Sequence, residues 1–410
     1  MKAYYVPKTH RRRKPKRRIF ILALSLLCVV ALTFVYGRSL FRSSMPESSK
    51  EIQPSGRGPA PEPVIARPRM GVILPLSGAF QRESEMLRDG IGLAWKEIQA
   101  EVAQGELVVQ DAGKDASEAV RIAREFASTP DTILVVAHLP AAVLSEIIPV
   151  FEEAKVPLLV VANSHESLIN HRWVIPFVSS DHTEGVCAAG LAAQWARDGG
   201  AAVIHDPGPY GMILSAGFKE GAENERFAVK TFACKADDPS MEALVERALQ
   251  GDPPVIWLAG SPVWGAGIID VIMAKDFKGR LLVPQSYGRM APDDLFGRYA
   301  DRLNILWQVA VTDSGKSGMQ DFRNSFLQSF LREPDWMAVL GYDAMRCAGK
   351  VLQGGELTRK RVWEHFLNYN SREKAFHGVG GEFYFDAKGY IQRPFQLVVH
   401  RHGKLMSVNR

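Results

Sequence analysis

From Met70 onward, short runs of Val, Leu and Ile alternate with longer stretches that carry apolar residues at helical spacing. A run that is apolar at nearly every residue is buried on both faces, which is typical of a parallel sheet covered by helices. Strands are predicted at 71–76, 106–111, 132–137, 156–162, 173–178, 201–206, 227–232, 254–260, 280–285 and 303–311. Helices are predicted at 83–103, 116–127, 141–153, 183–198, 210–222, 241–249, 263–274, 319–331, 336–352 and 360–368.

These units fall into two consecutive sets, each with its own helices. We therefore expect an α/β fold with two doubly wound parallel-sheet lobes. The C-terminal segment Gly381–Leu405 is predicted to form a hairpin. Because ligands of open α/β sheets bind outside the carboxyl ends of the strands, we expect a site in the cleft between the lobes. Closure of the lobes about a hinge is the expected motion.

The segment 19–36, IFILALSLLCVVALTFVY, contains no charged residue. At a rise of about 1.5 Å per residue it is about 27 Å long, enough for the hydrocarbon core of a membrane. The basic stretch Arg11–Arg18 before it predicts a cytoplasmic N-terminus and an exported globular part. We therefore predict a single-pass protein of the bacterial inner membrane, with its globular part in the periplasm or outside the cell.

Two other interpretations of this segment stay open. The first is a cleavable signal peptide with its cleavage site near Val35 and Gly37, although the apolar run is longer than a usual signal core. The second is lipid attachment at Cys28, where Leu27 stands in place of the small residue that a lipoprotein signal prefers. We favour the uncleaved anchor.

The charge of the chain is distributed unevenly. Residues 1–18 carry nine basic residues and no acidic one, and residues 38–69 carry six basic and three acidic residues. Since the whole chain has a net charge of +5, residues 70–410 have a net charge of −7. An acidic globular part argues against nucleic-acid binding. We interpret 1–18 as a basic cytoplasmic tail and the Pro-, Ser- and Gly-rich segment 37–69 as an extended tether.

Signatures of enzymes and metal sites are missing from the sequence. It has no GxSxG, HExxH or Walker A motif, and GAGIID (Gly265–Asp270) has Asp270 where a dinucleotide fingerprint needs its third glycine. Cys187, Cys234 and Cys347 are far apart and have no histidine at ligand spacing, so we expect buried free thiols. We predict no catalytic residue, no cofactor and no metal site, and hence a binding protein rather than an enzyme.

The order of several segments resembles the type I periplasmic solute-binding proteins, in particular the leucine/isoleucine/valine receptors of ABC transporters. The segments are GVILPLSG (Gly71–Gly78), Glu106–Phe126, Ile133–Leu139, Val156–Asn163, Val203–Gly221, VLGYDAMRCA (Val339–Ala348) and GGEFYFDAKGY (Gly380–Tyr390). The resemblance covers about 70–405 and implies two lobes joined by a three-strand hinge. It places lobe one at 70–180 and 310–376, and lobe two at 181–309 and 377–410.

The resemblance also implies a mode of ligand binding. In this family hydroxyls and backbone N–H groups after the third and fourth strands bind an amino acid's carboxylate, and a lobe-two tyrosine contacts the ligand. An acidic residue of lobe two holds the ammonium. Tyr210 matches the tyrosine, but Ser286 stands at the acidic position, and HLPAA (His138–Ala142) lacks the serine of amino-acid binders. Since a buried ammonium without a partner is costly, we expect a ligand other than a plain α-amino acid, or no ligand.

The candidate ligand-binding residues all follow predicted strands. Ser77 and Gly78 open a helix whose N–H groups can bind an anion. The rings of Trp264 and Tyr287 could stack on an apolar ligand, with core packing as the rival interpretation. The full set is Ser77, Gly78, His138, Ser164, His165, Tyr210, Ser261, Trp264, Ser286 and Tyr287.

We therefore predict a membrane-tethered solute-binding protein that captures a small polar ligand, an amino acid or a related compound. Its partners would be that ligand, the membrane through the N-terminal helix, and an ABC permease or another membrane protein. The alternative is a sensory or regulatory ectodomain of the same fold, with a degraded ligand site, that acts on an envelope protein.

Overall fold

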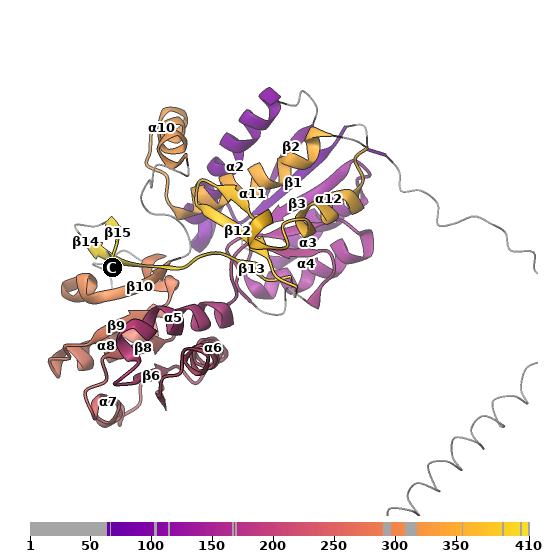
Figure 1. Ribbon diagram of the computed structural model, residues 1–410. Coiled ribbons are helices and arrows are strands. Elements are labelled where there is room, and N and C mark those ends of the chain that lie inside the picture. Colours follow the sequence, from indigo (N-terminus) through magenta and orange to yellow (C-terminus); the bar gives the residue numbers. More distant parts are fainter. Residues whose placement is uncertain are drawn as a thin grey trace, which may run out of the picture. The chain divides into compact units, whose positions relative to one another are not determined.

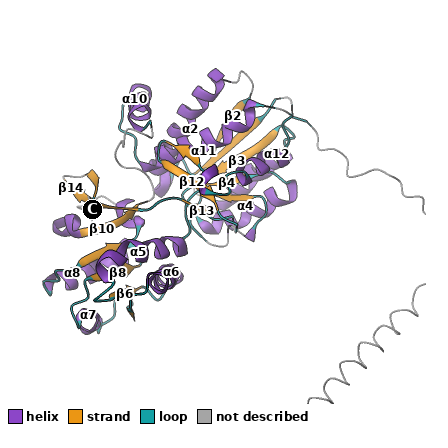
Figure 2. Cartoon of the chain, in the orientation of Figure 1, coloured by secondary structure: helices purple, strands orange, loops and turns teal. Residues whose placement is uncertain are grey.

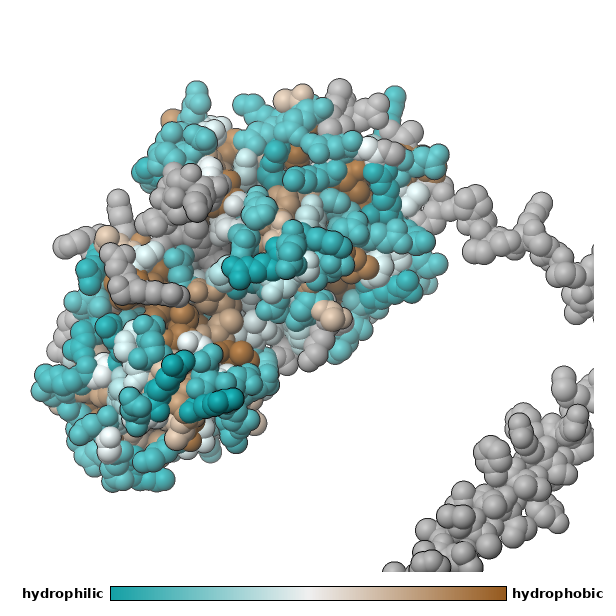
Figure 3. Space-filling model, viewed as in Figure 1, coloured by the Kyte–Doolittle hydropathy of each residue, from teal (hydrophilic) through white to brown (hydrophobic). Residues whose placement is uncertain are grey.

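The computed structural model describes residues 64–408, apart from 66, 102–104, 114, 166–167, 169, 290–296, 308–317, 355, 388 and 402–403. The predicted tail, the anchor at 19–36 and the tether up to residue 63 lie outside the described residues. None of the described helices combines the length and apolar character that a membrane span requires. Hydrophilic residues cover most of the face drawn in Figure 3, with smaller apolar areas between them.

The first sheet holds five parallel strands in the order β2-β1-β3-β4-β5. They are β1 (Arg69–Leu74), β2 (Glu106–Asp111), β3 (Thr132–Ala137), β4 (Leu158–Val160) and β5 (Val174–Pro176). The strands β1, β2 and β3 are labelled in Figure 1. Val72 and Leu74 pack with α2 (Gln81–Glu101) and α11 (Trp336–Gly349) on one face. Ile73 packs with α3 (Ala116–Ser128) and α4 (Ala141–Ala154) on the other. The alternation explains why the inner strands β1, β3 and β4 are apolar at nearly every residue, whereas the edge strand β2 also carries Glu106, Gln110 and Asp111.

The second sheet holds seven strands in the order β15-β14-β10-β9-β8-β6-β7. The parallel strands are β6 (Ala201–His205), β7 (Val229–Ala233), β8 (Val255–Ala259), β9 (Arg280–Val283) and β10 (Leu303–Trp307). β14 (Gln396–Arg401) runs antiparallel to β10, and β15 (Lys404–Ser407) runs antiparallel to β14. The helices α5 (Asp181–Ala196) and α6 (Pro209–Glu225) cover one face, and α7 (Met241–Leu249) and α8 (Pro262–Ala274) the other. The predicted parallel sheets are thus confirmed.

The remaining elements surround the first sheet (Figure 2). They are α10 (Met319–Phe330), α12 (Arg359–Leu367) and an antiparallel sheet of β11 (Phe376–Gly378), β12 (Gly381–Phe385) and β13 (Ile391–Gln392). Short 3₁₀ turns are η1 (Gly78–Phe80), η3 (Gln285–Arg289), η4 (Gly297–Arg302), η5 (Lys350–Gln353) and η6 (Arg372–Lys374). The buried Asp343 of α11 accepts the N–H groups of Val379 and Gly380, at 2.8 and 3.0 Å, and so fixes the small sheet to α11.

The C-terminal segment differs from the prediction of a single hairpin over Gly381–Leu405. Strands β12 and β13 belong to the small sheet beside α11, whereas β14 and β15 pair with each other at the edge of the second sheet. Arg393 and Pro394 separate the two pairs, and Pro394 has no N–H with which to continue a ladder. The part of the chain from 377 to 392, predicted to belong to lobe two, therefore lies in a sheet of its own.

Two segments lead from the first-sheet elements to the second sheet. Residues 177–180 connect β5 to α5, and residues 393–395 connect β13 to β14. The Ser179 hydroxyl donates to the carbonyl of Ile391 at 3.2 Å, which ties the two segments together. The third expected crossing follows β10 and falls on 308–317, outside the described residues.

Candidate ligand-binding site

The loop after β1 carries Ser77 and Gly78 at the carboxyl edge of the first sheet. Gly78 has φ +82°, a backbone conformation that glycine adopts without a steric cost, and η1 begins there. The Asp111 carboxylate at the end of β2 accepts the N–H groups of Leu76 and Gly113, both at 2.8 Å. The loop is thus held from the neighbouring strand, and the sequence alone did not single out Asp111 for this positioning role.

His138 follows β3 at the same edge and is only 8% exposed. Its Nδ1 lies 3.1 Å from the Val161 carbonyl, which can only accept, so Nδ1 carries the proton. Its Nε2 lies 3.8 Å from the Glu83 carboxylate, and its ring meets that of Phe80 edge-on. His138 is therefore a well-anchored residue between two side chains of the following segment.

The loop after β4 holds Ser164 and His165, half-buried and exposed respectively. Ala162 before them has φ +59°, which is uncommon for a residue with a Cβ and costs about 1–3 kcal/mol. This bend explains why β4 ends at Val160, two residues before the predicted end. The Asn163 side chain donates to the Leu139 carbonyl at 3.4 Å and accepts the His165 N–H at 3.0 Å, so it joins the loops after β3 and β4.

Because β1, β3 and β4 are neighbours in a parallel sheet, the structure brings all five lobe-one candidates to one edge. The same holds in lobe two, where Tyr210, Ser261 and Ser286 follow the adjacent strands β6, β8 and β9. There the Tyr210 hydroxyl donates to the Ser286 hydroxyl at 3.2 Å. The two residues that the resemblance singled out in lobe two, Tyr210 and Ser286, thus contact each other.

Trp264 and Tyr287 are core residues rather than exposed aromatic platforms. Trp264 is 6% exposed and donates its indole N–H to the Cys234 carbonyl at 2.9 Å. Tyr287 is fully buried and donates to the Ser261 carbonyl at 3.2 Å, and burial raises the pKa of its hydroxyl. Both rings pack into the apolar core. Their position therefore agrees with core packing, the alternative to stacking on a ligand.

Glu184 is a further positioning residue that the sequence analysis missed. It is fully buried in the first turn of α5, and its carboxylate accepts the backbone N–H and the side-chain amide of Gln285, at 2.6 and 3.1 Å. These bonds fix the loop that presents Ser286. No local motif marked Glu184, because its partner lies about a hundred residues further along the chain.

Three large apolar side chains at these edges are exposed. Phe80 follows β1 and is 43% exposed, Met212 follows β6 and is 56% exposed, and Val263 follows β8 and is 73% exposed.

In the described part of the chain, no group of three or more His, Cys, Asp or Glu residues could hold a metal ion. The three described cysteines are free thiols; Cys234 and Cys347 are buried, as predicted, whereas Cys187 is half-buried. Burial raises the pKa of Cys187 to about 11.

A family model described as periplasmic binding protein matches residues 68–403. The chain belongs to the periplasmic binding protein family. This confirms the resemblance read from the sequence, and a family of binding proteins is consistent with the prediction of a non-enzyme. A comparison with curated protein sequences gives no match.

Solved structures of periplasmic binding proteins share the fold. A leucine-binding protein from Thermotoga maritima is 21% identical, with a TM-score of 0.64, over 83% of this chain and 98% of that chain. An ABC transporter substrate-binding protein from Desulfitobacterium hafniense, in complex with Leu, is 19% identical, with a TM-score of 0.69, over 83% and 100%. A solute-binding protein from Rhodopseudomonas palustris, in complex with benzoate, is 16% identical, with a TM-score of 0.61, over 83% and 95%.

The residues from 62 onward form a compact unit of their own. We therefore expect residues 64–410 of this chain to fold by themselves.

Proposed function

We propose that this periplasmic binding protein captures a small carboxylate that has an apolar body and no ammonium group, and presents it to an ABC permease. The observation that carries the proposal is the hydroxyl pair of Tyr210 and Ser286. Ser286 accepts from Tyr210, so its own O–H is left to donate to a ligand acceptor. A donor at this position suits a carboxylate or carbonyl oxygen, whereas an ammonium would meet no negative charge from it.

The exposed apolar side chains support the same class of ligand. Phe80, Met212 and Val263 stand at the carboxyl edges of the two sheets, where they can cover a hydrocarbon or aromatic body. At about 25 cal/mol per Å² of apolar area removed from water, such contacts supply much of the binding free energy of a small ligand. Solved relatives bind Leu and benzoate respectively, so one fold serves both classes.

Membrane tethering through residues 19–36 belongs to the same proposal. Its support is the uncharged apolar run flanked by Arg11–Arg18. A tethered receptor stays close to its permease, which suits delivery to a fixed partner. Closure requires that the ligand bind the closed arrangement of the lobes more tightly than the open one.

The test is a thermal melt of purified residues 64–410 with leucine, benzoate, hexanoate, short amides and nucleobases. Binding stabilises the fold by about 2.7 kcal/mol at a hundredfold excess over Kd, which raises the midpoint visibly. We expect benzoate or hexanoate to raise it and leucine to leave it unchanged. Tyr210→Phe, which keeps the ring but removes the donor to Ser286, should weaken the response.

Two outcomes would redirect the proposal. A response to leucine alone would contradict the ligand class but keep a solute receptor. No response to any compound would favour the alternative, a regulatory ectodomain that acts on an envelope protein. The absence of an acidic residue at position 286 is the observation that favours that alternative.

A further inference from the structure

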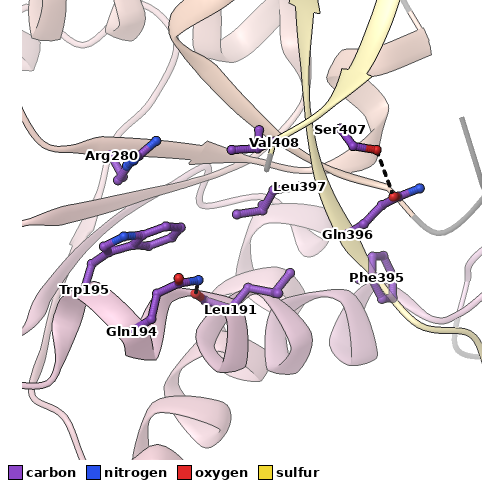
Figure 4. A pocket seen from close by; sticks show the side chains of 9 residues that line it. All are labelled: Leu191, Gln194, Trp195, Arg280, Phe395, Gln396, Leu397, Ser407 and Val408. Carbon is purple, nitrogen blue, oxygen red and sulfur yellow. Dashed lines mark hydrogen bonds between the residues drawn. The ribbon is translucent and has the colours of Figure 1, made fainter. Parts of the chain in front are cut away.

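An apolar cavity lies on lobe two, between α5 and the C-terminal strands. Its volume is about 190 Å³, and its apolar walls are Leu191, Trp195, Phe395, Leu397 and Val408. In Figure 4 Leu191 and Trp195 rise from α5 toward Leu397 and Val408, and Arg280 lies at the Trp195 end. The polar members are engaged with their neighbours: Gln194 donates to the Leu191 carbonyl, and Ser407 donates to Gln396.

A basic groove of about 420 Å³ continues from this cavity, and the two share Arg280 and Val408. The charged residues that line the groove are Lys278, Arg280, Arg302, Arg401 and Asp301. Arg280 is exposed and lies over the Trp195 ring at 5.0 Å, a geometry that does not use the N–H donors at the edge of its guanidinium. Of the four cations that line this groove, Lys278 pairs with Asp276, and Arg302 donates to the Phe277 carbonyl at 2.9 Å. Arg280, Arg302 and Arg401 therefore carry its positive charge, on a globular part whose net charge is −7.

The cavity and the groove are together called the lobe-two furrow. The groove and the candidate ligand site lie at opposite edges of the second sheet. Arg280 begins β9, Arg302 immediately precedes β10, and Arg401 ends the antiparallel β14, so the groove lies at the amino edge of the parallel strands. Tyr210, Ser261 and Ser286 lie at the carboxyl edge. An occupant of the furrow would therefore leave the ligand site accessible.

We propose that the lobe-two furrow binds an acidic segment of a partner protein, with one large apolar side chain in the cavity and adjacent carboxylates on Arg280 and Arg401. The charge of the groove calls for an anionic occupant, and guanidinium groups bind carboxylates with two parallel hydrogen bonds. A buried aromatic or aliphatic anchor surrounded by charged contacts is the usual composition of such an interface.

Three other occupants fit the furrow less well. The chain's own residues 1–63 are strongly basic and would be repelled. A flat membrane surface would meet the exposed arginines but would not fill the recessed apolar cavity. A second copy of the chain offers the exposed Leu331 close to Glu333, but that carboxylate already pairs with Arg323 of its own chain.

The experiment selects ligands from a displayed library of random 12-residue peptides against purified residues 64–410. We expect enrichment of sequences with two or more acidic residues beside one large apolar residue. A synthetic peptide with that consensus should bind less tightly as salt is raised. The double variant Arg280→Gln/Arg401→Gln should weaken it at least tenfold.

Arg247→Gln is the matched control, because Arg247 is also exposed and lies over an aromatic ring, that of Phe232, at 5.7 Å. It should bind the consensus peptide as the unchanged protein does. Selection without acidic enrichment, or a consensus peptide whose affinity survives the double variant, would overturn the proposal. So would arginine-dependent binding to phosphatidylglycerol vesicles without peptide binding, or self-association that the double variant abolishes.

Discussion

The guanidinium of Arg393 lies 4.4 Å from the ring centroid of Phe383 and is enclosed by protein. It is 3% exposed, and a second ring, that of Phe177, lies 4.9 Å away. None of its three nitrogens has a hydrogen-bond partner among the described residues. The buried Asp343 carboxylate attracts it from beyond ion-pair distance, and burial lowers the pKa of Arg393 to about 10. The buried charge of Arg393 thus lies on one of the two described segments that connect the sheets, without a hydrogen bond to a described residue.

Replacement of Arg393 by Met should stabilise the protein. Several unsatisfied buried donors cost about 1–3 kcal/mol each, whereas stacking on two rings returns about 2 kcal/mol per ring. Met retains most of the apolar packing, so we expect the free energy of unfolding of residues 64–410 to rise by about 1–4 kcal/mol in urea titrations. Arg172→Met is the control, since Arg172 also stacks on a ring, that of Trp363, but is exposed. A clear loss of stability in Arg393→Met would show that the guanidinium is satisfied in solution.

Asp343 should make stability depend on pH in the weakly acidic range. Burial raises the pKa of its carboxyl from 3.8 to about 6, although Arg393 and the N–H groups of Gly380 and Val379 oppose the shift. The folded protein therefore binds this proton more tightly than the unfolded chain. Its contribution favours the fold below about pH 4 and is lost as the pH rises to about 6. An asparagine side chain cannot titrate, so the Asp343→Asn variant should lose the contribution of this carboxyl to the change of unfolding free energy between pH 4 and 6.5. If the pH dependence is the same in both proteins, the Asp343 carboxyl does not cause it.

Two glycines of α2 should respond oppositely to the same substitution. A Cβ on Gly90 would lie 2.0 Å from the Ala338 carbonyl oxygen of α11, whereas a Cβ on Gly92 would meet nothing within 4 Å. Gly90→Ala should destabilise by about 1–3 kcal/mol or more because two helix backbones must separate. Gly92→Ala should stabilise by about 0.5–1 kcal/mol through helix propensity. Denaturant unfolding of both variants checks this, and equal effects would mean that α2 and α11 are not in close contact.

Features that depend on residues close together in the sequence were predicted better than features that depend on distant residues. Apolar runs such as 132–137 and helical spacing such as 241–249 specify their elements locally, and both agree with the structure to the residue. The family resemblance singled out Tyr210 and Ser286, and the structure joins their hydroxyls by a hydrogen bond of 3.2 Å. Burial was less predictable: Trp264 and Tyr287 follow strands as ligand contacts do, but neighbouring elements enclose them.

Long-range partners were the part that local patterns could not give. Glu184 holds Gln285, and Asp343 holds the turn at Val379, each across a large separation in sequence. No period or motif in the chain encodes such a pair. The C-terminal segment was misassigned for a related reason, since alternating apolar residues predict strands but do not say which sheet a strand joins.

A carboxylate at position 286 should change which ligands the site prefers. Ser286→Asp should create a partner for an ammonium, and the Tyr210 hydroxyl, which donates to position 286 at 3.2 Å, would help to keep the new carboxylate ionised. We expect the ratio of the affinity for leucine to the affinity for benzoate to rise at least tenfold, as measured by calorimetry on residues 64–410. The new carboxylate would attract the ammonium of leucine and repel the carboxylate of benzoate. Ser329→Asp adds the same charge at an exposed position of α10 and should leave the ratio unchanged. If Ser286→Asp also leaves it unchanged, position 286 does not contact the ligand, and the assignment of the site to the Tyr210–Ser286 edge fails.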